Sequence, residues 1–165
     1  MLHHVSVGVA DVERAGRFYD AVMKTLGCRR VMEFLPYAIA YGARLPEFWV
    51  QLPHDRRPAS VGNGVHTAFS AKNKNAVHAF HRAALDAGGM NDGDPGPRPD
   101  YGDSYYGAFV RDPDGNKIEA MLIVGAAAKP RRKAPKAKKK SAEKRAPARG
   151  KAGKRKTAGR KAARR

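Results

Sequence analysis

The feature of this sequence that most limits its possible folds is an internal repeat. When the chain is shifted by 62 positions, two segments superimpose without a gap, and the matched residues are His4 with His66, Phe18 with Phe80, Ala21 with Ala83, and Gly27 with Gly89. A segment repeated at a fixed spacing is one supersecondary unit that buries its apolar face against a neighbouring copy. We therefore expect two copies of one module in the first 128 residues.

Each copy opens with a strand that is followed by an amphipathic helix. Residues 4–9 and 65–70 alternate between apolar and small or polar side chains, which is the period of a half-buried strand. Asp11 and Asn73 then stand where helix N-caps are expected, and apolar residues recur at helical spacing after each of them. The pattern predicts one strand and one helix at the start of each module.

Further strands are expected after the helices. The strand-like segments are residues 30–34, 37–41, 48–52, 105–111 and 117–124. Residues 91–103 are rich in Gly, Pro and Asp, so we expect a loop there. The sequence thus predicts an α+β fold of two βαβββ modules, with helices covering the apolar faces of a cupped sheet. The other faces, which carry His4, His66 and Glu119, would line a shared concave pocket.

Several short motifs, taken together, resemble one protein superfamily. They are His-Val at 4–5, Val-Ala-Asp at 9–11, AGRFY at 15–19, HTAF at 66–69 and FVRDPDGNKIE at 109–119. This combination resembles the vicinal oxygen chelate superfamily, which includes glyoxalases, extradiol dioxygenases, and bleomycin- and fosfomycin-resistance proteins. The resemblance is to its bacterial glyoxalase-like branch. The resemblance covers nearly all of residues 1–124 and implies one glyoxalase-like domain there. We place the domain at residues 1–128 and a separate tail at residues 129–165, because the charge composition changes at that point.

The resemblance also implies a metal site with one ligand from each of four strands. His4, His66 and Glu119 match three of the ligand positions, and the fourth is expected within residues 48–52, where Gln51 has suitable chemistry. Two imidazoles and a carboxylate suit a divalent Zn, Ni, Mn or Fe ion with open positions for substrate. Glu119 is also a candidate catalytic base beside a metal-polarised carbonyl.

Two kinds of function remain open from the sequence. The resemblance implies a metal-dependent lyase, isomerase or dioxygenase that acts on a small molecule with adjacent oxygens, and the alternative is a metal-free small-molecule binding or resistance protein on the same fold. Tyr101, Tyr105 and Tyr106 are candidates for the lining of a substrate pocket, although aromatic residues at these positions suit a core equally well. Two chains could complete each other's site in a homodimer.

All of the excess positive charge lies near the C-terminus. Residues 1–128 contain 14 Lys and Arg and 14 Asp and Glu, whereas residues 129–165 contain 19 Lys and Arg and one acid. A segment with no aromatic or large apolar residue cannot bury a core, so we expect a disordered tail that resembles those of linker histones. Such a tail would bind nucleic acid without sequence preference. The alternative is a solubilising appendage.

The N-terminal sequence has no signal-peptide pattern, and no segment approaches the roughly 18 apolar residues of a membrane span. We therefore expect a cytoplasmic protein without membrane association, which the tail could hold on the nucleoid.

Deleting residues 129–165 should abolish binding to DNA of arbitrary sequence, because the remaining chain is neutral. The full chain should bind with an affinity that falls steeply between about 50 and 200 mM salt, owing to counterion release. Fluorescence anisotropy with a labelled duplex measures both properties. A chain with a charge-neutral tail of the same length is the matched control, and equal binding by the truncated chain would contradict the prediction.

Overall fold

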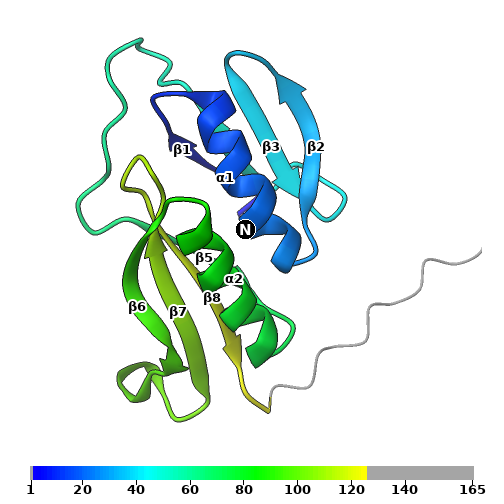
Figure 1. Cartoon of the computed structure of the whole chain (residues 1–165), viewed down its shortest axis with the longest axis vertical. Coiled ribbons are helices and arrows are strands. Elements are labelled where there is room, and N and C mark those ends of the chain that lie inside the picture. Colours follow the sequence, from blue (N-terminus) through cyan, green and yellow to red (C-terminus); the bar gives the residue numbers. More distant parts are fainter. Residues whose placement is uncertain (1, 126–165) are drawn as a thin grey trace, which may run out of the picture. The chain divides into compact units, whose positions relative to one another are not determined.

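The structure is a computed structural model that describes residues 2–125, and it contains two βαβββ modules (Figure 1). The elements of the first module are β1 (Val5–Gly8), α1 (Val12–Thr25), β2 (Arg29–Phe34), β3 (Ala38–Gly42) and β4 (Phe48–Gln51). Those of the second are β5 (His66–Ser70), α2 (Lys74–Asp86), β6 (Met90–Pro97), the 3-10 helix η1 (Pro99–Tyr101), β7 (Tyr105–Arg111) and β8 (Lys117–Ile123). The predicted α+β fold of two modules is confirmed.

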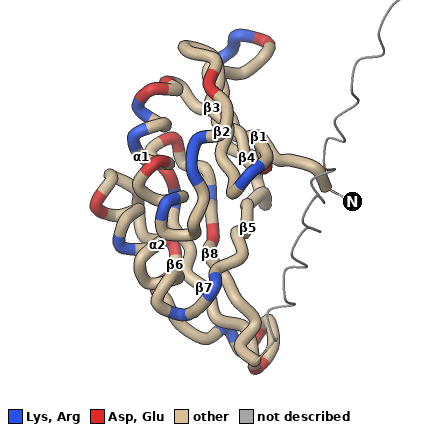
Figure 2. Tube along the Cα trace, turned by 90° about the vertical axis from the view of Figure 1, so that its right-hand side faces the viewer, with Lys and Arg blue, Asp and Glu red and all other residues tan. Residues whose placement is uncertain are grey.

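The two modules have the same sheet topology. Their strand orders are β1-β4-β3-β2 and β5-β8-β7-β6, and the first strand of each module pairs in parallel with the last one. Both helices lie on one side of the strands, as Figure 2 shows. Each sheet therefore has one face against a helix and one face turned away from the helices.

The helices begin where the sequence predicts. The side chains of Asp11 and Asn73 each accept a hydrogen bond of 2.9 Å from the backbone N–H three residues later. The apolar stripe of α1 is buried, whereas in α2 one residue at helical spacing, Leu85, is 38% exposed. Leu85 directly follows Ala84, which is buried, so it lies beyond the edge of the buried stripe.

One hydrophobic core joins the two modules. The ring of Phe48 in β4 lies 5.1 Å from the Tyr19 ring in α1 and 5.0 Å from the Phe69 ring in β5, measured between centroids. Phe80 and Ala84 of α2 belong to the same buried cluster. Because neither module closes this core alone, their packing explains why the repeat occurs as a pair.

The expectation of a loop at residues 91–103 is wrong. Residues Met90–Pro97 form β6, the edge strand of the second sheet, and η1 follows directly. The pairing of β6 with β7 shifts register twice, on either side of Gly93. An edge strand tolerates proline and glycine at such irregularities, because the lost ladder hydrogen bonds lie at the edge of the sheet.

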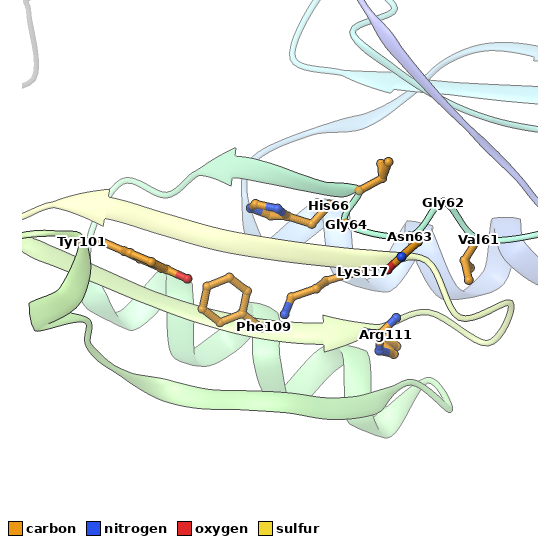
Figure 3. Close-up of a pocket in the computed structure, with 10 residues that line it drawn as sticks. Val61, Gly62, Asn63, Gly64, His66, Tyr101, Phe109, Arg111 and Lys117 are labelled. Carbon is orange, nitrogen blue, oxygen red and sulfur yellow. The ribbon is translucent and has the colours of Figure 1, made fainter.

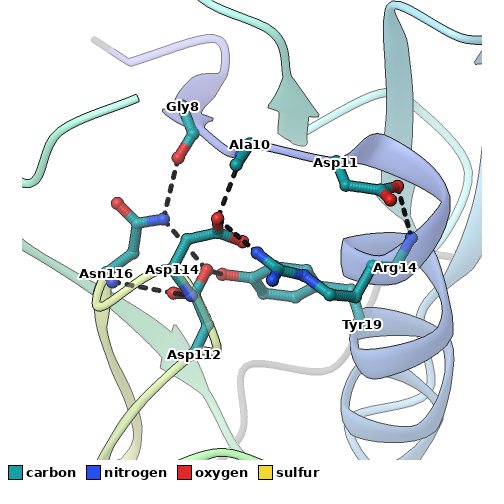
Figure 4. Close-up of polar contacts among 8 residues, drawn as sticks. All are labelled: Gly8, Ala10, Asp11, Arg14, Tyr19, Asp112, Asp114 and Asn116. Carbon is teal, nitrogen blue, oxygen red and sulfur yellow. Dashed lines mark hydrogen bonds and ion pairs between the residues drawn. The ribbon is translucent and has the colours of Figure 1, made fainter. Parts of the chain in front are cut away.

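A buried carboxylate in the turn between β7 and β8 bonds to the first module (Figure 4). Asp112 is 1% exposed and accepts a hydrogen bond of 2.8 Å from the hydroxyl of Tyr19 in α1. Within the turn, Asp112 also accepts hydrogen bonds from the backbone N–H groups of Asp114 and Asn116 and from the Asn116 side chain. The turn is thereby tied to the helix of the other module.

Two further side chains of this turn bind the segment between β1 and α1. Asn116 donates a hydrogen bond of 3.0 Å to the carbonyl of Gly8. Asp114 accepts one of 2.9 Å from the backbone N–H of Ala10 and pairs with Arg14 at 2.6 Å. The turn motif that carries the family resemblance therefore joins the two modules through hydrogen bonds and an ion pair.

The predicted disordered tail at residues 129–165, and the domain boundary at residue 128, lie outside the described residues. Within residues 2–125, no helix is both long and apolar enough to cross a membrane.

Replacing Tyr19 by Phe should lower the free energy of unfolding by about 1.5–3 kcal/mol, because the buried Asp112 carboxylate loses a hydrogen-bond donor. Burial and the charge of Asp112 raise the pKa of Tyr19 well above its usual range, so the hydroxyl remains a donor in neutral and mildly alkaline solution. Urea unfolding measures the change. Tyr37→Phe, at an exposed position, is the control. If both variants lose the same free energy of unfolding, the Tyr19–Asp112 hydrogen bond does not stabilise the domain.

Candidate functional site

Glu119 in β8 is a buried acid on the face of the sheet that the helices do not cover. Its neighbours Ile118 and Ala120 point into the core, so the alternation of a strand turns Glu119 to the opposite face. Despite that position the residue is only 1% exposed. Acidic side chains are rarely so buried unless partner groups accompany them.

Side chains from both neighbouring strands surround this carboxylate. From β7, the hydroxyl of Tyr105 donates a hydrogen bond of 2.7 Å to Glu119 Oε1. From β5, His66 Nε2 lies 3.3 Å from Glu119 Oε2. The structure thus brings together two of the four predicted metal ligands, His66 and Glu119, with one of the predicted pocket tyrosines.

A glycine on β7 leaves the space that the carboxylate occupies. A Cβ atom placed on Gly107 would lie 2.7 Å from Glu119 Oε1, which is closer than real Cβ contacts allow. Any larger residue at this position would have to displace the carboxylate. Gly107 therefore helps to set the position of Glu119, a role that no sequence signal indicated.

The phenol of Tyr105 is kept in its protonated form. Burial, the hydrogen bond to Glu119 and the charge of Glu119 raise the pKa of Tyr105 above its usual range. Tyr105 is therefore a stable donor to the carboxylate at neutral pH, which compensates part of the cost of burying that group.

The other two predicted ligands lie on the corresponding face of the first module. Gln51 pairs in register with Gly8, so it shares the face of Trp49 two residues earlier. The ring of His4 meets the edge of Trp49 at 6.4 Å between centroids, and His4 Nδ1 is hydrogen-bonded to His3 Nδ1 at 2.8 Å. His4 and Gln51 lie at opposite ends of the β1–β4 pair, so the structure does not bring them together. Within residues 2–125, His4 does not join His66 and Glu119 in one cluster either.

Among residues 2–125, no three His, Cys, Asp or Glu side chains gather closely enough to hold a metal ion. Of the four predicted ligands, the described residues bring only His66 and Glu119 into contact. An imidazole and a carboxylate are the donor types that Zn and similar ions prefer. The described residues of one chain therefore fit half of a metal ligand set.

The three candidate tyrosines have different surroundings. Tyr105 contacts Glu119, and Tyr101 of η1 packs edge-on against Tyr105 at 5.2 Å between centroids. Tyr106 instead makes a hydrogen bond of 2.8 Å with His78 of α2. Because successive residues of a strand point to opposite faces, Tyr106 lies on the helix side and away from Glu119.

A cavity of about 440 Å³ opens at His66 (Figure 3). Glu119 does not itself line this cavity, but its Oε2 lies 3.3 Å from the Nε2 atom of His66, which does. Its walls include His66, Tyr101, Phe109, Arg111 and Lys117, together with the loop at residues 61–65. Sequence analysis did not single out Lys117, Arg111 or Phe109. Strand periodicity could have pointed to Lys117, because it lies two residues before Glu119 and therefore shares its face of the sheet.

A model of one protein family matches residues 1–120, and its description is Glyoxalase/Bleomycin resistance protein/Dioxygenase superfamily. The chain belongs to this superfamily. Among solved structures, a glyoxalase/bleomycin resistance protein from Albidiferax ferrireducens is 38% identical with a TM-score of 0.64, over 73% of this chain and 97% of that one. No curated protein matches the chain significantly.

More distant members of the superfamily share the fold. A glyoxalase-related enzyme from Fulvimarina pelagi is 21% identical with a TM-score of 0.58, over 73% of this chain and 86% of that one. A lactoylglutathione lyase from Agrobacterium tumefaciens is 19% identical with a TM-score of 0.53, over 73% and 92%. The superfamily includes enzymes, and these two similarities extend to the fold alone.

Replacing Gly107 by Ala should cost about 1–3 kcal/mol of unfolding free energy, because the new methyl group overlaps Glu119 Oε1. The cost should shrink when Glu119 is replaced by Ala in the same chain, since the overlapping carboxylate is then absent. Gly8→Ala, whose Cβ would meet its neighbours at an ordinary 3.7 Å, is the control in urea unfolding. An equal cost of Gly107→Ala in both backgrounds would show that Gly107 does not position Glu119.

Proposed function

We propose that this superfamily member is a metal-dependent lyase or isomerase that acts on a small molecule with two adjacent oxygens. The observation that carries the proposal is the state of Glu119, a buried carboxylate with one hydrogen-bond donor, Tyr105, and one imidazole, His66, beside a cavity. A carboxylate with an oxygen left outside the hydrogen-bond network is suited to accept a proton.

Two residues of the chain would have separate roles in a proton transfer, Glu119 as the base and Tyr105 as the group that orients it. Tyr105 occupies Glu119 Oε1, so Oε2 is the atom available to take a proton from a carbon next to a carbonyl group. The same oxygen could return the proton to the neighbouring carbon, which would complete an isomerisation. Tyr105 would hold the carboxylate in one orientation throughout. A divalent ion, when bound, would polarise the two substrate oxygens and stabilise their developing negative charge.

We propose that a homodimer completes the ligand set. Catalytic sites of this kind commonly use three protein ligands, whereas the described residues of one chain bring two together, His66 and Glu119. In a two-fold dimer, these two residues of one chain could face His4 of a second copy, and two equal sites would form. The first module also exposes aromatic surface on this face, where Phe34 stacks on Trp49 at 6.2 Å between centroids.

A metal-free small-molecule binding protein is the second candidate. It is favoured by the 3.3 Å separation of His66 Nε2 and Glu119 Oε2, because an imidazolium and a carboxylate at this distance can neutralise each other. The cavity would then serve for binding alone. The proposed association with nucleic acid is independent of both candidates, since it depends on residues 129–165.

Metal retention separates the two candidates. The full chain, purified without a His tag, is incubated with Zn, Ni, Mn or Fe ions at neutral pH, passed through a desalting column and analysed for metal. We expect retention of one ion per chain for the preferred metal. Retention should fall in acid solution, because protons compete with the metal for the histidine nitrogens.

Single substitutions of His4, His66 or Glu119 (to Ala, Ala and Gln) should each remove most of the bound metal. His78→Ala is the matched control, because His78 lies on the helix side of the second sheet and bonds Tyr106. If the wild-type chain retains no metal, the binding-protein candidate replaces the enzyme. If His4→Ala retains the ion, the first module does not contribute a ligand.

A further inference from the structure

We propose that the cavity beside Glu119 recognises an anionic group of the substrate, a carboxylate or a phosphate, through Lys117 and Arg111. This inference rests on the proposed function, in which the same cavity receives the substrate. It narrows the substrate class to small acids whose adjacent oxygens lie next to the charged group.

The sheet register places the basic side chains in one row across three strands. Lys117 of β8 is the direct partner of His66 in β5 on one side and of Arg111 in β7 on the other. Direct partners in a sheet point to the same face and lie about 5 Å apart. All three side chains line the cavity, as Figure 3 shows.

The next row along the strands contains the reactive group. Glu119 pairs directly with Phe109 of β7, and it follows Lys117 by two residues on the same face. Two residues of a strand span about 7 Å. A small acid bound with its charged end at Lys117 could therefore present the neighbouring carbon to Glu119. A 2-hydroxy or 2-oxo acid, or a phosphate ester of similar length, has this geometry.

The positive charge of the first row is only partly neutralised. Lys117 Nζ and Arg111 Nη2 lie 3.0 Å and 3.4 Å from the same atom, Asp92 Oδ2 of β6. Neither contact has hydrogen-bond geometry. Within residues 2–125, Lys117 and Arg111 form no other ion pair. Two cations therefore share one carboxylate, which leaves one net positive charge at the cavity wall.

Both cations retain donors that an anion could use. Arg111 Nη1 is held by the carbonyl of Gly115 at 3.1 Å, so the guanidinium is fixed while its other N–H groups remain outside that bond. Lys117 Nζ lies 4.8 Å above the centre of the Phe109 ring, which directs the ammonium group toward the row of Glu119. Guanidinium and ammonium groups are the donors that commonly bind carboxylate and phosphate in proteins.

The alternative is that Asp92, Lys117 and Arg111 only tie the edge strand β6 to its sheet. The anion site and the purely structural cluster predict different effects of Asp92→Asn on anion affinity. For an anion site the substitution strengthens binding, because it removes the competing carboxylate and leaves both cations free. For a purely structural cluster it weakens the sheet and gives no gain in anion affinity.

The test is a nitrogen-15 chemical-shift titration of the full chain, without added metal, at about 20 mM ionic strength to limit screening. The probes are glycolate, inorganic phosphate and ethylene glycol, which is the neutral counterpart of glycolate. The amide signals of Asn63, Gly64, His66 and Lys117 report on the cavity. Reading these residues separates the site from any anions that collect on the basic C-terminal segment.

We expect glycolate, phosphate or both to shift these signals in a saturable way, and ethylene glycol to leave them in place. The tighter of the two anions identifies the head group as carboxylate or phosphate. Lys117→Gln should weaken anion binding about tenfold, and Asp92→Asn should strengthen it. Lys24→Gln, which removes the same charge from an exposed position on α1, should have no effect.

The proposal is wrong if neither anion shifts the cavity signals, or if ethylene glycol shifts them as strongly as glycolate does. It is also wrong if Lys117→Gln and Lys24→Gln bind anions equally, or if Asp92→Asn does not strengthen binding. Because no metal takes part, these outcomes are independent of metal retention. Failure of the anion site can therefore be told apart from failure of the proposed function.

Discussion

The hydrogen bond between the Tyr19 hydroxyl and the buried carboxylate of Asp112 is the interaction on which the rest of the domain depends. It joins the helix of the first module to the last turn of the second. Strand β8 begins at Lys117, directly after that turn, and it supplies both Lys117 and Glu119. A turn held in place at its start thus fixes where the Glu119 carboxylate and the neighbouring ammonium group of Lys117 lie.

The β7–β8 hairpin carries two buried carboxylates, Asp112 and Glu119, and they differ in how many hydrogen bonds they accept. Asp112 accepts hydrogen bonds from four donors, which is the condition under which a buried charge is stable. Glu119 is equally buried but accepts one, from Tyr105, within the described residues. A buried carboxylate with few hydrogen-bond donors adds little to stability, so a ligand-binding role explains Glu119 better than a structural one.

The sequence was sufficient for the parts of the fold that follow from periodicity. Alternation and helix caps predicted the strands and helices, and the same alternation placed Glu119 of β8 on the face that the helices leave uncovered. It failed at β6, because glycine and proline at an edge strand are indistinguishable from a loop without the partner strand.

Contacts between elements were beyond the sequence. The repeat equates His4 with His66, but it does not say whether the two modules of one chain place them together, and within residues 2–125 they belong to different clusters. Nor did Arg111 at the end of β7, or Lys117 and Glu119 at alternate positions of β8, indicate a cavity, since charged residues on strands ordinarily face water. Gly107 carried no signal at all, because its role depends on the exact position of a side chain on another strand.

Anomalous diffraction from crystals of the full chain grown with the retained metal tests the central claim most directly. The account predicts a peak about 2.0–2.2 Å from His66 Nε2 and from a carboxylate oxygen of Glu119, with His4 of a second copy completing the site. It would be contradicted by crystals in which His66 and Glu119 stay paired without an ion, or in which metal is found only beside His3 and His4.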